Sequence, residues 1–80
     1  MKNAENLAFD IMEEICETDE IREDPDMDLF ELGLIDSLST INIILAIEEK
    51  TGLKLQPTDF ERKDISTVNN FKAFLERQEN

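Results

Sequence analysis

The chain has 80 residues, and its twenty acidic and eight basic side chains give a formal net charge of −12 at pH 7. That charge repels phosphate backbones and anionic lipid, so nucleic acid and membrane surfaces are disfavoured as partners and basic proteins are favoured. The length predicts a single domain over residues 1–80, near the lower size limit for one hydrophobic core. Histidine is absent, which removes the usual general base for a serine or cysteine nucleophile.

Cysteine usage and hydropathy indicate the compartment. Cys16 is the only cysteine, so an internal disulfide is excluded, and its place on an apolar stripe predicts a core position. The N-terminal residues form no apolar signal segment, and no run approaches the ~18 consecutive apolar residues that a membrane span requires. We therefore expect a soluble, cytoplasmic monomer without stable membrane insertion.

The first half of the chain predicts one helix followed by a long loop. Between Asn6 and Glu17 apolar residues recur as pairs four apart, which is typical of a helix with one buried face. From Thr18 to Ile35 the chain is rich in acids, contains Pro25 and shows no sustained period, so we expect a loop. Its apolar side chains are expected to attach at least part of the loop to the core: Leu29, Phe30, Leu32 and Leu34.

The second half predicts two longer helices and a short one. Asp36 or Ser37 can cap the second helix, because either side chain can accept from unpaired first-turn amides, and Gly52 is expected to end it. A short turn over residues 59–62, capped by Thr58, and a link over 63–66 should follow. Thr67 or Ser66 then caps a final helix with this buried stripe: Val68, Phe71, Phe74 and Leu75. The predicted fold class is all-α, a bundle of three main helices plus one short helix with a long first loop.

The second helix has more apolar surface than a small core can cover. Its apolar residues span roughly 220° of the circumference at about 100° per residue, whereas a helix lying on a core needs little more than about 100°. Ile43, Ile44 and Ile47 form the natural core set. A partly exposed strip with an acid at its margin remains: Leu38, Ile41, Leu45 and Glu48. Either the first loop covers this strip, or the strip docks into a basic, apolar groove on a partner.

Ser37 can be interpreted in three ways. A serine after an aspartate at a helix start is commonly only a cap. A hydrolytic nucleophile is rejected, because Gly33 stands four residues before Ser37, unlike the G-x-S-x-G motif, and no histidine can activate the hydroxyl. Covalent modification stays open, since a phosphodiester there would meet the positive end of the helix dipole and free amides. The basic residues do not predict an anion-binding patch, because they are scattered: Lys50, Lys54, Arg62 and Lys63.

A calcium site is a weaker alternative. Asp24, Asp26 and Asp28 imitate the start of a calcium-binding loop, but Leu29 stands where glycine is required and Ile35 where a bidentate glutamate is required. A calcium-binding half-site therefore stays an alternative, beside an unmodified helical adaptor that uses only the apolar strip.

The sequence resembles the acyl carrier protein family in the run from Phe30 to Leu38, in the helix end Ala46-Ile47-Glu48-Glu49 and in the four-helix layout. The resemblance implies that Ser37, the serine of the D-S-L motif, carries a 4′-phosphopantetheine arm that holds cargo as a thioester, without catalysis by the chain itself. It implies that Asp36 helps a phosphopantetheinyl transferase to dock. It also implies that partners bind the second helix, which matches the strip deduced above: Leu38, Ile41, Leu45 and Glu48.

Three segments are similar to the D-alanyl carrier proteins of teichoic acid D-alanylation: Gly33 to Ser37, Pro57 to Arg62 and Thr67 to Asn70. Ser39 and Asn42 stand where fatty-acid carriers have acids. Leu38 departs from the phenylalanine or methionine common in the D-alanyl family, so a free-standing carrier of a fatty-acid, polyketide or nonribosomal peptide pathway is the alternative. The implied partners are the transferase and adenylating or acyl-transfer enzymes with basic docking surfaces.

Overall fold

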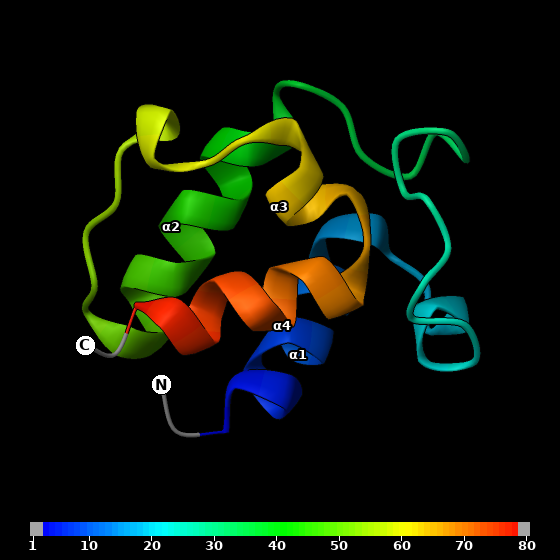
Figure 1. Ribbon diagram of the computed structural model, residues 1–80, viewed down its shortest axis with the longest axis horizontal. Coiled ribbons are helices and arrows are strands. Elements are labelled where there is room, and N and C mark those ends of the chain that lie inside the picture. The colour runs from blue at the N-terminus through cyan, green and yellow to red at the C-terminus, as the bar shows by residue number, and fades with distance from the viewer. Residues whose placement is uncertain (1–2, 79–80) are drawn as a thin grey trace.

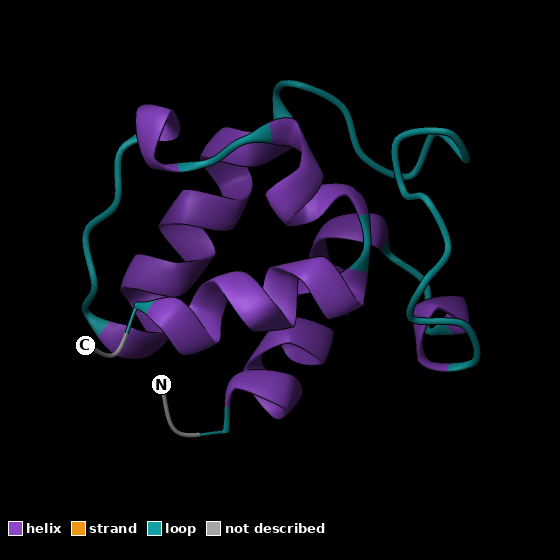
Figure 2. Cartoon of the chain, in the orientation of Figure 1, coloured by secondary structure: helices purple, strands orange, loops and turns teal. Residues whose placement is uncertain are grey.

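The computed structural model describes residues 3–78. Their helices are α1 (Ala4–Cys16), α2 (Ser39–Thr51), α3 (Arg62–Ser66) and α4 (Val68–Arg77), and two short 3₁₀ turns are η1 (Glu20–Arg22) and η2 (Pro57–Asp59). Figure 2 shows only helices and loops over these residues, which confirms the all-α fold class. No helix within residues 3–78 has the length and hydropathy to cross a membrane.

Helices α1 and α4 pack against each other at the centre of the fold. In Figure 1, α4 runs across α1, while α2 lies to one side and the first loop to the other. Helix α4 contacts α1 and α3, and α1 also contacts α2. The predicted stripe of α4 is buried throughout, as its exposed fractions show: Val68 1%, Phe71 0%, Phe74 2% and Leu75 0%. Thr67 caps α4, because its Oγ1 accepts from the backbone N–H of Asn70 at 3.0 Å.

Helix α1 fixes the start of the first loop. It was predicted over Asn6–Glu17 and is observed over Ala4–Cys16, a shift of the kind expected at helix ends. The guanidinium of Arg22 donates to the carboxylate of Glu13 at 2.7 Å and lies 5.0 Å from the centre of the Phe9 ring. The hydrogen bond to Arg22 also holds the pKa of the Glu13 carboxyl below its ordinary value.

The middle of the first loop is attached to the corner between α3 and α4. The backbone N–H of Leu29 donates to the carbonyl of Ser66 at 2.7 Å, and the Leu29 side chain is fully buried. Asn69 donates from its backbone N–H to the Pro25 carbonyl at 3.1 Å. The expectation that loop residues enter the core is confirmed for Leu29, whereas Leu32 stays 57% exposed.

Between α2 and α4 the observed elements differ from the predicted ones. The short turn lies over Pro57–Asp59 instead of 59–62, and the segment predicted as a link over 63–66 belongs to α3. Each element begins where an aspartate satisfies an amide three residues back: Gln56 N–H donates to Asp59 Oδ2 and Glu61 N–H to Asp64 Oδ2, both at 2.8 Å. These capping bonds, and not Thr58, fix both starts.

Cys16 is a buried thiol, as predicted, with 9% of its surface exposed. Burial disfavours the thiolate and raises the pKa of Cys16 to about 11. Because the unfolded thiol ionises near its ordinary pKa of 9.0, stability should be unaffected below pH 9 and fall as pH rises from about 9 to 11.

This behaviour can be measured by chemical denaturation between pH 7 and pH 11. We expect Cys16→Ala to lose that part of the slope, which is at most about 1.4 kcal/mol per pH unit. A thiol reagent at pH 8 should label wild type only upon unfolding. Rapid labelling of the folded chain, or an equal alkaline slope in both proteins, would contradict the prediction.

Candidate functional site

Ser37 lies on the surface in the turn just before α2. Gly33, at a φ of +74°, completes a tight turn in which the amides of Leu34 and Ile35 both donate to the carbonyl of Leu29, at 2.9 and 3.3 Å. Ile35 is then buried at 4% exposure, and the chain returns to the surface. Ser37 is exposed, and its hydroxyl makes no hydrogen bond with residues 3–78.

Asp36, not Ser37, caps α2. Its Oδ1 accepts from the backbone N–H of Leu38 at 3.0 Å and from that of Ser39 at 3.1 Å. The cap is reciprocal, because the Ser39 hydroxyl accepts a hydrogen bond from the Asp36 N–H at 3.1 Å. The expectation of free first-turn amides beside Ser37 is therefore wrong for two of them, because the Asp36 carboxylate occupies both. Ser37 is consequently not needed as a cap.

The outer face of α2 carries the predicted apolar strip. Ile43, Ile44 and Ile47 are buried as expected, and the structure adds Ala46. The strip is exposed, with the following fractions: Leu38 75%, Ile41 47% and Leu45 55%. The alternative in which the first loop covers the strip is thus wrong. Glu48 is half-buried at its margin, and Lys54 lies 3.9 Å from its carboxylate.

A small cavity of about 190 Å³ opens beside Ser37, between the first loop and the starts of α2 and α3. Arg62 supplies its basic side chain, and the guanidinium carbon lies 4.1 Å from the centre of the Phe30 ring. The full lining is Phe30, Ser37, Thr40, Pro57, Phe60, Glu61, Arg62 and Ile65. The sequence predicted no role for Arg62 here. No local pattern could have placed it, because the fold alone brings the start of α3 to Ser37.

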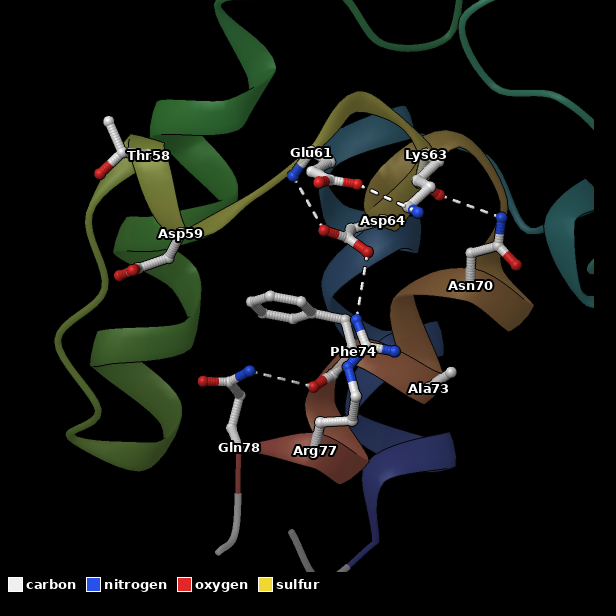
Figure 3. A pocket seen from close by; sticks show the side chains of 10 residues that line it. All are labelled: Thr58, Asp59, Glu61, Lys63, Asp64, Asn70, Ala73, Phe74, Arg77 and Gln78. Atoms are coloured by element: carbon white, nitrogen blue, oxygen red, sulfur yellow. Dashed lines mark hydrogen bonds and ion pairs between the residues drawn. The ribbon is translucent and has the colours of Figure 1, made fainter.

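A larger, polar cavity of about 570 Å³ lies between η2, α3 and α4 and does not include Ser37 (Figure 3). Both cations that line it are paired with acids of the same cavity: Arg77 lies 3.2 Å from the carboxylate of Asp64, and Lys63 lies 3.1 Å from that of Glu61. Phe74 forms part of its wall. Since both cations of the larger cavity already have acidic partners, the smaller cavity at Ser37 is the better candidate site for an anionic group.

Three acidic side chains of the first loop accept hydrogen bonds within the loop or from α4. Asp24 accepts from the Asp26 N–H at 3.3 Å, and Asp28 accepts from the Glu31 N–H at 3.0 Å. Asp26 accepts from the side-chain amide of Asn69 at 2.6 Å. Across residues 3–78 no three side chains of metal-binding type lie close enough to hold an ion. The calcium half-site therefore gains no support.

Comparison with known proteins decides the family. A family model described as a phosphopantetheine attachment site matches residues 9–75. The chain belongs to this family. It is a carrier protein, and its cofactor is covalently attached 4′-phosphopantetheine.

Several relatives match over most of their length. The D-alanyl carrier protein of Lactococcus lactis subsp. cremoris (strain MG1363) is 43% identical over 70 residues, which cover 88% of this chain and 89% of the relative. That of Staphylococcus saprophyticus is 40% identical over 69 residues, covering 86% and 88%. That of Bacillus subtilis (strain 168) is 39% identical over 63 residues, covering 79% and 81%. The resemblance to D-alanyl carrier proteins is thereby confirmed.

The residues around Ser37 fit the cofactor. A phosphodiester needs an accessible hydroxyl, and that of Ser37 is exposed without an intramolecular partner among residues 3–78. It also needs positive charge nearby, and Arg62 lines the cavity that Ser37 borders. The site therefore has both the atom and the charge that the group requires.

Proposed function

We propose that Ser37 is the attachment site of 4′-phosphopantetheine and that the chain carries its cargo from one enzyme to the next. The observation that carries this proposal is the exposed, unbonded hydroxyl at the head of α2, inside the matched segment 9–75. When bound, the group supplies a terminal thiol that holds cargo as a thioester. We propose that the chain performs no catalysis of its own, in keeping with its carrier family, and note that it has no histidine, the usual general base, to activate Ser37.

The proposed cargo is D-alanine, destined for teichoic acid. The relatives named above are D-alanyl carrier proteins. A free-standing carrier of a polyketide or peptide pathway is the alternative that a loading experiment distinguishes.

The proposed docking strip consists of Leu38, Ile41 and Leu45 with Glu48 at its margin. Ile41 and Leu45 face solvent on α2, and Leu38 faces solvent directly before α2 and next to Ser37, so a partner bound there would reach the cofactor. We propose that a phosphopantetheinyl transferase and adenylating or acyl-transfer enzymes with basic surfaces bind it. A cytoplasmic location stays a prediction.

Asp36 is proposed to assist the transferase. Its Oδ1 takes both amide bonds of the cap, whereas its Oδ2 accepts no hydrogen bond from residues 3–78. The second oxygen can therefore accept from a basic side chain of the transferase without releasing the cap.

The test is intact-mass spectrometry of the purified chain incubated with coenzyme A and a phosphopantetheinyl transferase. We expect a gain of one phosphopantetheine mass. The product is then offered D-alanine with ATP and a D-alanine-adenylating enzyme. In parallel reactions it is offered L-alanine or a fatty acid, each with ATP and a matching ligase. We expect only D-alanine to add, in a form that hydroxylamine releases. A native chain that never gains the first mass contradicts carriage at Ser37, and exclusive loading of another acid contradicts the cargo.

A further inference from the structure

The backbone at the start of α2 offers little positive charge to a phosphodiester on Ser37. The Asp36 carboxylate already accepts from the amides of Leu38 and Ser39, so it neutralises part of the helix dipole. Asp36 itself places a negative charge next to Ser37. Because the whole chain carries −12, another anion at this point would be stabilised by a cation from elsewhere in the fold.

Arg62 is a cation without an acidic partner. Of the eight basic side chains, Lys2 lies outside the described residues. Six of the others have a carboxylate oxygen within 4.0 Å: Arg22, Lys50, Lys54, Lys63, Lys72 and Arg77. Arg62 has none among residues 3–78, although acids greatly outnumber bases in the chain. A guanidinium left unpaired in so acidic a protein indicates a role outside intramolecular ion pairing.

The fold holds this guanidinium at the cavity of Ser37. It lies over the Phe30 ring at 4.1 Å, a cation–π contact that restricts its position. Arg62 is the first residue of α3, and its backbone is fixed by the capping bond from the Glu61 N–H to Asp64. The Glu61 carboxylate borders the same cavity but lies 3.1 Å from Lys63, which offsets its charge.

We propose that Arg62, held on the Phe30 ring, binds the phosphodiester of the cofactor and so keeps the base of the arm at the α3 side of the cavity. This inference rests on the proposed attachment at Ser37. The contact is a charge-assisted hydrogen bond from the guanidinium to a phosphate oxygen, a pairing for which arginine is well suited. Arg62 is a positioning residue, since it touches the cofactor far from the thiol that carries the cargo.

The test is a thermodynamic cycle on melting temperature. Wild type and Arg62→Gln are each measured before and after modification with coenzyme A and the transferase. The change in Tm upon modification should be more favourable in wild type by about 2–5 °C, and high salt should reduce this difference. Lys72→Gln is the matched control, because it removes one positive charge from α4, where neither Lys72 nor its acidic partner Glu5 lines the Ser37 cavity. It should behave as wild type in the cycle.

A second measurement uses only the wild-type protein and so does not depend on whether a variant folds. In ¹⁵N-labelled wild type, the Nε–H signal of Arg62 should shift upon modification, while that of Arg22, already paired with Glu13, should not. Normal mass gain with no difference in the cycle and no shift overturns the proposal but leaves attachment at Ser37 intact. Absence of any mass gain overturns the proposed function instead. If Arg62→Gln slows only the transferase, Arg62 serves the partner enzyme, which also overturns the proposal.

Discussion

Ser37→Ala is expected to abolish the mass gain from coenzyme A completely while leaving the fold intact. The Ser37 oxygen is part of the proposed phosphodiester bond, so no residual modification should survive its removal. Ser37 is exposed and its hydroxyl makes no hydrogen bond with residues 3–78, and Asp36 caps the helix without it. The free energy of unfolding should therefore change by no more than about 0.5 kcal/mol. Mass spectrometry and thermal melting measure the two effects.

Ser39→Ala is the matched control for this prediction. Its hydroxyl lies two residues further along and accepts from the Asp36 N–H at 3.1 Å, so its loss should lower stability by about 0.5–2 kcal/mol. Modification should nevertheless proceed to completion. Ser37→Ala thus tests attachment of the cofactor, whereas Ser39→Ala tests the stability that the helix cap provides. Mass gain in Ser37→Ala, or its loss only in Ser39→Ala, would contradict attachment at Ser37.

The faces of α2 could be predicted because they follow from periodicity alone. An apolar arc wider than a small core can cover must leave some side chains outside, and Leu38, Ile41 and Leu45 are those side chains. The stripe of α4 was predicted on the same ground. Leu32 shows where the argument weakens, because a loop has no period that could distinguish its buried leucine from its exposed one.

Helix α3 was missed because five residues are too few to show a period. A signal was nevertheless present in the sequence, since Asp64 stands three residues after Glu61, the spacing of a reciprocal cap. The same spacing relates Asp36 to Ser39 and would have selected Asp36 over Ser37 as the cap. A pair of capping residues three positions apart is therefore a better sequence signal for a helix start than a single capping residue.

The pairing of Arg62 with the Ser37 cavity lay beyond any reading of the sequence. It depends on the attachment of the first loop to the α3–α4 corner, through the bond from the Leu29 N–H to the Ser66 carbonyl. That attachment brings Phe30 to the start of α3, where Arg62 lies on its ring. The segment between α1 and α2 therefore supplies both Ser37 and the Phe30 ring that positions the guanidinium of Arg62.

Leu45→Glu is expected to reduce kcat/KM for modification by the transferase at least tenfold, with little change in stability. Leu45 is 55% exposed at the centre of the docking strip, so the fold loses little when it is replaced. A partner that buries Leu45 loses apolar contact and must desolvate a carboxylate. Central interface residues of this kind contribute about 1–3 kcal/mol, and 1.4 kcal/mol corresponds to a factor of ten. Steady-state kinetics with varied carrier concentration measure the effect.

Ala73→Glu is the control that distinguishes damage to the docking strip from the effect of one added negative charge. Ala73 is exposed on α4 and lines the polar cavity away from Ser37, so this variant adds the same negative charge without touching the strip. Its kcat/KM should stay near that of wild type. Leu45→Ala should fall between wild type and Leu45→Glu, because it removes contact area but adds no charge. If Ala73→Glu and Leu45→Glu lose activity equally, net charge governs the encounter, and the strip is not the docking surface.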